Sequence, residues 1–157
     1  MAQFGPTVLR LAVGVVFTAH GAEKLFGLWG GGGLTGTAAF FAQAGLTPAY
    51  PLAILVGLVE LGGGLLLIAG AFTLVTAAAL TVIMLVAVWT VHLSSGFFLN
   101  WTAAPGLGHG YEFNLALTGA LASLMLTGPG AFSIDRRRAR AAETQAFGRA
   151  RMRAGQG

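Results

Sequence analysis

Long apolar runs, separated by short breaks rich in glycine and proline, dominate the pattern along this chain. Four runs are long enough to cross a bilayer, and they cover residues 6–27, 49–70, 72–95 and 111–128. A helix of about 20 residues crosses the roughly 30 Å of hydrocarbon in a membrane, because each residue adds about 1.5 Å. The pattern therefore predicts an all-α protein, a transmembrane four-helix bundle.

Prolines and glycines mark the ends of the predicted spans. Pro6 suits the first turn of a helix, Pro48 and Pro51 fit the start of the second span, and the Gly-Pro-Gly at 128–130 ends the fourth. Residues 34–46 are apolar but too short to span. We expect this segment to form a short helix that lies along the interface or re-enters the membrane.

The distribution of charge supports a membrane setting. Charged residues make up 9% of the sequence, against about 25% in an ordinary soluble domain. Between Leu25 and Ile134 the only charged side chains are Glu60 and Glu112. A segment of this length with two charges cannot build a solvated surface, so we expect it to be embedded in lipid.

Basic residues gather at the C-terminal end. Seven of the nine lysines and arginines lie between Arg136 and Arg153. An even number of crossings puts both termini on one side of the membrane, and the positive-inside rule, applied to Arg10 and this tail, assigns that side to the cytoplasm. The sequence thus predicts a membrane domain over residues 1–135 and a basic cytoplasmic tail over 136–157.

Other interpretations of the two ends carry less weight. Residues 1–22 contain a short apolar core like that of a signal peptide, but only Arg10 is basic there and no clean Ala-x-Ala site precedes a polar start. The arginine tail directly follows apolar spans, so we expect no nucleic-acid partner; it forms a surface helix or stays disordered. The lack of cysteine excludes disulfides and thiolate chemistry within the chain.

Polar residues share one face of the first span. At 100° per residue, Arg10, His20 and Lys24 fall within an arc of about 80°. Arg10 lies near the cytoplasmic end, whereas His20 lies about 15 Å further along, in the outer half of the bilayer. In the second span Glu60 lies about midway, and Gly57 and Gly64 on its face let a neighbouring helix approach closely.

The third and fourth spans add further polar groups near their outer ends. His92 ends the third span, with Trp89 one turn before it, while His109 in the following glycine-rich loop is expected to be solvated. The fourth span opens with Glu112, whose face continues through Ala116, Gly119 and Ser123 as another close-packing stripe. If these faces turn inward, one polar cavity forms in the outer half of the bundle. Its predicted members are His20, Lys24, Glu60, His92 and Glu112.

Each of these groups also has a purely structural interpretation. Arg10 would anchor its helix at the inner interface, and Lys24 would pair locally with Glu23 or compensate a buried carboxylate. His92 would donate to a backbone carbonyl, and Trp89 would join an interfacial aromatic belt. A carboxylate in the middle of the bilayer usually has a functional role, so we expect Glu60 to be functional.

Four segments, residues 9–27, 57–70, 110–117 and 128–135, read LRLAVGVVFTAHGAEKLFG, GLVELGGGLLLIAG, GYEFNLAL and GPGAFSID. Over roughly residues 4–135 they resemble the DoxX family of small bacterial four-helix membrane proteins, which implies a multi-pass protein of the bacterial plasma membrane. Ala131 departs from the pattern, since a basic residue commonly follows the GPG there. The residues that match by position are Arg10, His20, Lys24, Glu60 and Glu112, with His92 as a looser match.

The resemblance implies a redox role, since the family is similar to membrane subunits of thiosulfate:quinone oxidoreductase and is associated with sulfur-linked, oxidative-stress and quinone-detoxification systems. We expect the bundle to hold a quinone headgroup. Glu60 or Glu112 would exchange the proton, and His20 or His92 would bond a carbonyl oxygen. The predicted roles are therefore catalytic for Glu60, His20 and Glu112, and substrate-binding for Lys24, His92, Trp89 and Arg10.

The chain has no cysteine, flavin motif or iron–sulfur pattern, so electrons must come from a soluble or membrane redox partner or a bound cofactor. A b-type haem between His20 and His92 is a weaker hypothesis, because two histidines on separate helices are thin support for it. We expect no metal site. The alternatives to an enzyme subunit are a non-catalytic scaffold that recruits redox proteins to the bilayer, and a carrier of a small solute or protons. A carrier of four spans would need to form a homo-oligomer.

Overall fold

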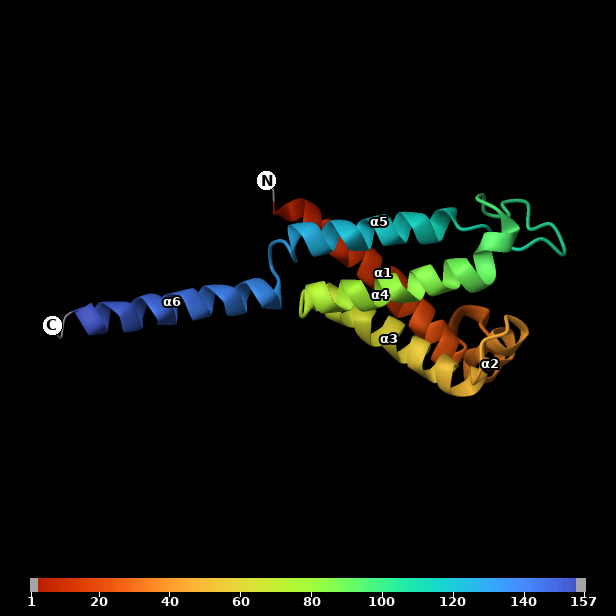
Figure 1. Cartoon of the computed structure of the whole chain (residues 1–157), viewed down its shortest axis with the longest axis horizontal. Helices are drawn as coiled ribbons and strands as arrows, with labels where there is room; N and C mark the ends of the chain where they lie inside the picture. The colour runs from red at the N-terminus through yellow and green to blue at the C-terminus, as the bar shows by residue number, and fades with distance from the viewer. Residues whose placement is uncertain (1–2, 155–157) are drawn as a thin grey trace.

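The computed structural model describes residues 3–154, and within that range every regular element is helical (Figure 1). The α-helices are α1 (Phe4–Phe26), α2 (Gly33–Gln43), α3 (Ala49–Ala69), α4 (Thr73–Ala87), α5 (Glu112–Thr127) and α6 (Ile134–Ala154). Short turns follow α1 at η1 (Leu28–Gly30) and extend α4 through η2 (Val88–His92) and η3 (Leu93–Ser95). The prediction of an all-α protein is confirmed.

Three helical stretches in the described residues are long and apolar enough to cross a membrane, namely Phe4–Phe26, Ala49–Ala69 and Thr73–Ser95. The helix Glu112–Thr127 is apolar but has only 16 residues. All four begin and end within two residues of the predicted limits. The agreement follows from the breakers, since Gly27 and Gly70 adopt the left-handed conformation that ends a helix.

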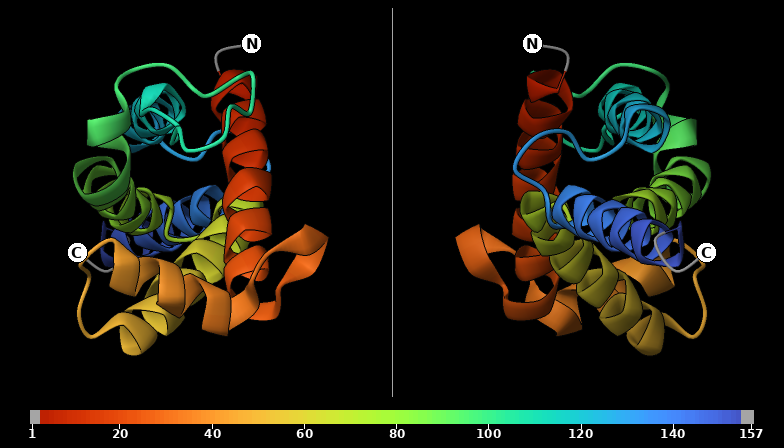
Figure 2. Two further views of the ribbon diagram at one scale, coloured as in Figure 1. Left: turned by 90° about the vertical axis from the view of Figure 1, so that its right-hand side faces the viewer. Right: turned by 90° about the vertical axis from the view of Figure 1, so that its left-hand side faces the viewer.

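These four helices enclose a common interior. α1 contacts α3 and α5, and α4 contacts the same two helices, so each helix has two neighbours in a closed ring. Figure 2 shows α5 nearly along its axis and α1 upright beside it. The interior is filled by apolar side chains from every helix of the ring. The buried members are Val13, Phe17, Leu67, Ala77, Leu80, Met84, Leu117, Leu121 and Leu124.

Glycines bring α1 and α3 into close contact. A Cβ added at Gly64 would meet the backbone of Thr18, and one added at Gly21 would meet the backbone of Leu61. At Gly57 the nearest neighbour is the side chain of Leu25. The predicted close approach along the face of Gly57 and Gly64 is confirmed, and it lets polar groups of α1 and α3 meet directly.

The predicted close-packing stripe on the fourth span is wrong. Ala116 and Gly119 are exposed, and a Cβ at Gly119 would meet nothing within 4 Å. The buried face of α5 instead carries Asn114, Leu117, Leu121 and Leu124. The large apolar side chains at these positions bury more area than a stripe of small residues, so they turn toward the interior.

Arg10 is buried at the end of the molecule that holds the N-terminus, with 2% of its surface exposed. Its guanidinium donates to carbonyl oxygens of α3 and of residues 128–135, which we call the closing segment. Nη1 donates to Leu67 at 2.9 Å and also to Ile68, and Nε donates to Pro129 at 2.9 Å. Nη2 donates to Ala131 at 3.3 Å and to Phe132 at 3.0 Å. We call this set of contacts the Arg10 clasp.

The closing segment also fixes the start of two helices. The Ser133 hydroxyl accepts from the Arg136 N–H at 3.3 Å and so caps α6. The Asp135 carboxylate accepts from the Phe72 and Thr73 N–H groups, each at 2.8 Å, and caps α4. The GPGAFSID motif is therefore explained by contacts within the chain.

The tail is helical, as one of the two sequence interpretations proposed. α6 extends away from the rest of the molecule, from the end that also holds the N-terminus (Figure 1). Its described arginine side chains that are exposed include Arg137, Arg138 and Arg140. Residues 155–157 of the predicted tail lie outside the described residues.

Candidate functional site

A cavity of about 570 Å³ lies between α1, α3, α4 and α5, at the end of the molecule that carries α2 and the loop after His92. Its size falls within the range of about 300–1,000 Å³ typical of small-molecule sites. Most of its wall is aliphatic or aromatic. The polar side chains that line it are His20, Lys24, Glu60, Thr90, His92, His109 and Asn114.

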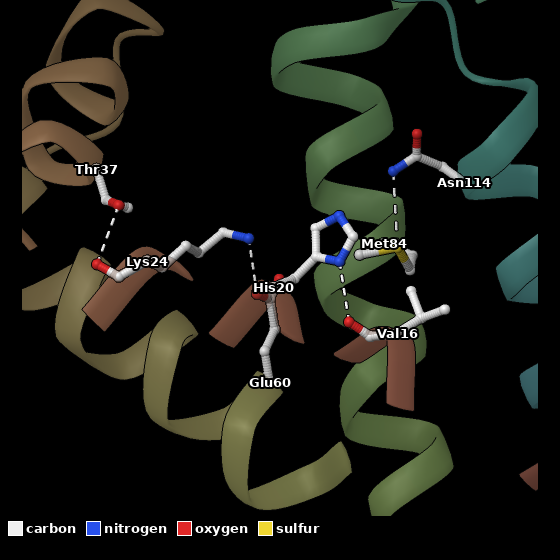
Figure 3. A network of polar contacts seen from close by, with 7 residues as sticks. All are labelled: Val16, His20, Lys24, Thr37, Glu60, Met84 and Asn114. Atoms are coloured by element: carbon white, nitrogen blue, oxygen red, sulfur yellow. Dashed lines mark hydrogen bonds and ion pairs between the residues drawn. The ribbon is translucent and has the colours of Figure 1, made fainter. Parts of the chain in front are cut away.

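An ion pair between α1 and α3 forms one wall of the cavity. Lys24 Nζ lies 2.7 Å from Glu60 Oε2, with 22% of the lysine side chain exposed and 3% of the glutamate (Figure 3). The pair is possible because the glycine contacts hold the two helices close. Lys24 thus pairs with Glu60 and not with Glu23, which answers the question that the sequence left open. A buried carboxylate needs such a partner, because burying an unpaired charge destabilises the fold by roughly several kcal/mol.

His20 lies one helical turn before Lys24 on the same wall. Its ring nitrogen Nδ1 is 2.9 Å from the Val16 carbonyl oxygen, and its second ring nitrogen points away from Val16 (Figure 3). The ring stacks on Phe113 of α5, with ring centroids 6.4 Å apart and planes inclined by 29°. This contact bridges α1 and α5 at the cavity edge.

His92 enters the cavity wall from the end of α4. Residues 88–92 form a π-helical turn, and Thr90, Val91 and His92 all line the cavity. Single π turns are often found at functional sites, because the wider turn redirects side chains. His92 Nδ1 lies 2.8 Å from the His109 carbonyl oxygen, so the ring donates to backbone, as its structural interpretation predicted.

Three polar residues of this wall, Thr90, His109 and Asn114, were not among the predicted site residues. His109 is exposed, as expected for a solvated loop residue, and it also lines the cavity. Asn114 is buried, and its amide nitrogen lies 3.6 Å from Met84 Sδ. The signal for Asn114 is its spacing, since it falls at the first position of the apolar stripe that continues with Leu117 and Leu121.

Arg10, a predicted substrate-binding residue, does not line the cavity. All three guanidinium nitrogens donate to backbone carbonyls in the Arg10 clasp, near the opposite end of α1. The side chain serves as an anchor because the carbonyls at the C-terminus of α3 carry partial negative charge that a buried cation compensates.

Glu112 and Trp89 are also absent from the cavity wall. Glu112 Oε1 accepts from the Leu99 N–H at 3.0 Å, so the carboxylate orders the loop before α5. Trp89 has 78% of its surface exposed and faces away from the interior. The structure therefore does not bring Glu112 and Trp89 together with the other predicted site residues at the cavity.

The arrangement suits an apolar ring with polar substituents at its edge. Apolar walls from α3, α4 and α5 would cover the faces of a ring, and the Lys24–Glu60 pair and the two histidines would meet its polar atoms. In residues 3–154 no three His, Cys, Asp or Glu side chains are grouped closely enough to hold a metal ion.

Comparison with known proteins gives consistent matches. The DoxX family model matches residues 5–93, which include His20, Lys24, Glu60 and His92. "Uncharacterized membrane protein Rv3486" of Mycobacterium tuberculosis is 32% identical over 142 residues, which cover 87% of this chain and 83% of the relative. "Putative oxidoreductase CatD" of Bacillus subtilis is 29% identical over 133 residues, covering 85% and 86% of the two chains.

"Inner membrane protein YqjF" of Escherichia coli is 31% identical over 133 residues, covering 84% of this chain and 90% of the relative. No solved structure matches the chain. The family model covers more than half of the chain, including both members of the Lys24–Glu60 pair, and two of the three relatives are named as membrane proteins. On these grounds the chain belongs to the DoxX family.

Proposed function

We propose that the chain is an integral protein of the bacterial plasma membrane in which α1, α3, α4 and α5 cross as a four-helix bundle. Many large apolar side chains on the outside of these helices are exposed, among them Val8, Leu55 and Leu74, and lipid would cover them. The N-terminus and the start of α6 lie at one end of the molecule (Figure 1). By the positive-inside rule, the arginines of α6 support the cytoplasmic side for that end.

In this orientation residues 1–135 form the membrane domain, residues 136–157 form the basic cytoplasmic tail, and α2 lies at the outer surface as an interfacial or re-entrant helix. The cavity then falls in the outer half of the bilayer. A ligand that dissolves in the membrane would reach it without leaving the lipid.

We infer that this cavity binds the headgroup of a quinone and that the protein is a membrane component of a quinone-linked oxidoreductase system. The observation that carries this proposal is an apolar cavity of about 570 Å³ with a buried ion pair in its wall. A quinone ring needs flat apolar walls and a few polar groups at its edge, which is the usual design of small-molecule sites.

The side chains of the chain would supply binding and proton handling. Glu60 is the candidate proton-exchanging group, because it is a carboxylate within the apolar wall with a basic partner, and Lys24 would donate a hydrogen bond to a ring oxygen, with His20 beside it on the wall. The electrons would come from a partner protein, since the sequence holds no cysteine. The name of the Bacillus relative describes that protein as an oxidoreductase, which agrees with a redox role for this one.

Filling the cavity tests this function. Val56 lines the cavity, whereas Leu55 beside it on α3 has 56% of its surface exposed on the outer face. The full chain is reconstituted in lipid nanodiscs, and binding of tetramethyl-1,4-benzoquinone and of its hydroquinone is measured by calorimetry. We expect Val56→Phe to weaken binding at least about tenfold by occupying the cavity, and the matched control Leu55→Phe to bind as the original chain does.

Equal thermal midpoints of the two variants would show that the loss of binding comes from the filled cavity and not from a destabilised fold. If neither redox form binds the unmodified chain, the quinone proposal is wrong. The non-catalytic scaffold would then be favoured, and its supporting observation is α6, which projects from the body where a cytoplasmic redox partner could reach it. Whether the bundle acts alone or as a homo-oligomer does not affect this test.

A further inference from the structure

Two of the three histidines that line the cavity, His20 and His92, hold a hydrogen on the same ring atom. His20 Nδ1 lies 2.9 Å from the Val16 carbonyl oxygen, and His92 Nδ1 lies 2.8 Å from the His109 carbonyl oxygen. A carbonyl oxygen only accepts hydrogen bonds, so in both rings Nδ1 must be the donor. The two contacts come from different helices, and both rings line the same cavity.

This arrangement fixes the character of the other ring nitrogen. A neutral imidazole carries one N–H, and with that hydrogen on Nδ1 the Nε2 atom is a bare acceptor. The neutral rings of His20 and His92 therefore both present acceptors. A group that also only accepts, such as a carbonyl oxygen, makes no hydrogen bond with either ring.

The remaining polar groups of the wall accommodate a hydroxyl as well. Lys24 Nζ has three N–H bonds, of which one is used by Glu60, so it can donate to a ligand oxygen. His109 has the opposite tautomer, because its Nδ1 accepts from the Asn100 N–H at 3.3 Å and its Nε2 carries the hydrogen. A ligand hydroxyl both donates and accepts, so it can donate to a histidine Nε2 and accept from Lys24 at the same time.

We propose that the cavity discriminates between the redox forms of its ligand and holds the hydroquinone more tightly than the quinone. This inference rests on the proposed function and concerns the same site. A phenolic O–H of the hydroquinone donates to Nε2 of His20 or His92, and its oxygen still accepts from Lys24. The quinone carbonyl accepts from Lys24 but offers no donor to the histidine acceptors, in a cavity whose walls are mostly apolar.

The expected preference is about tenfold for one additional hydrogen bond. A ligand held about tenfold more tightly in its reduced form has the midpoint potential of its two-electron couple raised by roughly 30 mV on binding. The bound couple thus becomes a better electron acceptor than the free one. The same two histidines would set both the affinity and the potential.

The experiment uses three molecules with the same tetramethylated ring: tetramethyl-1,4-benzoquinone, tetramethylhydroquinone and the dimethyl ether of that hydroquinone. The full chain in lipid nanodiscs is titrated with each under anaerobic conditions at one fixed pH, about pH 8. We expect the hydroquinone to bind about tenfold more tightly than the quinone. The ether, which has no hydroxyl hydrogen, should bind no better than the quinone.

Variants assign the preference to the rings. His20→Phe and His92→Phe keep a flat ring but remove the acceptor, and each should reduce the preference several-fold, while Trp89→Phe on the outer face serves as the control. If one histidine variant fails to fold, the other provides the same test. Equal binding of quinone and hydroquinone by the unmodified chain would overturn this inference and leave the proposed function standing. A preference that survives in both variants also overturns it, and failure of both forms to bind contradicts the proposed function itself.

Discussion

The two ends of the helical body use buried charge in opposite ways. At the end near the N-terminus, each guanidinium nitrogen of Arg10 donates to a backbone carbonyl, and the surrounding chain leaves it no spare donor direction for a ligand. At the other end, the Lys24–Glu60 pair and the two cavity histidines are each held by one or two contacts and still face about 570 Å³ of open volume.

The number of hydrogen-bond donors left free for a ligand distinguishes a structural charged residue from a functional one better than its degree of burial does. Arg10 and Glu60 are equally buried, at 2% exposure each. What distinguishes them is whether their hydrogen-bonding capacity is consumed within the chain. The Arg10 clasp should therefore respond to mutation mainly in stability, whereas the cavity end should respond mainly in ligand binding.

Arg10→Met is expected to give the largest loss of stability. It leaves the carbonyls of Leu67 and Pro129, among others, without a donor in a buried site, and hydrogen bonds to a charged group contribute about 1.5–3 kcal/mol each. We expect a loss of at least about 3 kcal/mol, seen as a fall in thermal midpoint in detergent. Arg10→Lys should fall in between, because an ammonium cannot reach carbonyls on two sides at once. A midpoint unchanged in Arg10→Met would show that the clasp is not needed.

Gly64→Val is expected to give the next largest effect. A side chain there would collide with the backbone of Thr18 and push α1 away from α3, at a cost of about 1–3 kcal/mol. Gly62→Val is the matched control, because a Cβ at Gly62 meets nothing within 4 Å. Thermal unfolding of the two variants, compared side by side, checks the difference. If the control were destabilised equally, β-branching and not helix contact would be the cause.

Asp135→Asn is expected to give a small effect that depends on pH. Partial burial acts to raise the pKa of the Asp135 carboxyl, but hydrogen bonds from Thr73 and Phe72 and the charge of Arg138 outweigh it and hold that pKa below its usual range. A lowered carboxyl pKa means that the ionised form stabilises the fold above the unfolded value of about 3.9. This stabilisation is lost as the pH falls through the folded pKa.

Thermal midpoints measured at intervals from about pH 5 to pH 2.5 test this sign. The unmodified chain should lose more of its midpoint over this interval than Asp135→Asn does. Asn keeps one oxygen acceptor for the cap but does not ionise, so it should flatten the acid limb of the curve. Parallel curves for the two proteins would mean that Asp135 does not contribute to acid sensitivity.

The helices could be predicted from the sequence because their signals are local. A long apolar run and a glycine after it define a helix without reference to the rest of the chain, and α3, which ends at Ala69 just before Gly70, agrees with its predicted span to within one residue. The closeness of Lys24 and Glu60 was also accessible, since a carboxylate in an apolar helix requires a cation. The same reasoning does not determine which carboxylate forms the ion pair with Lys24.

The remaining features depend on contacts that residue types do not encode. The partners of Arg10 are carbonyl oxygens, which every residue carries, so no pattern of side chains points to them. The predicted buried face of α5 follows its small residues, whereas the observed buried face follows the stripe of leucines and Asn114. The volume of the cavity and the ring nitrogen that each histidine uses are properties of the assembled fold.

The Arg10 clasp joins a residue near the beginning of the chain to carbonyls that are synthesised last in the membrane domain. During biosynthesis α1 enters the bilayer first, yet its guanidinium meets Pro129 and Phe132 only after more than a hundred further residues have left the ribosome. Until then, in the proposed orientation, the cation would remain hydrated at the cytoplasmic surface. Completion of the clasp is thus a late step of assembly, and it pins α1 only in chains that have been made through the closing segment.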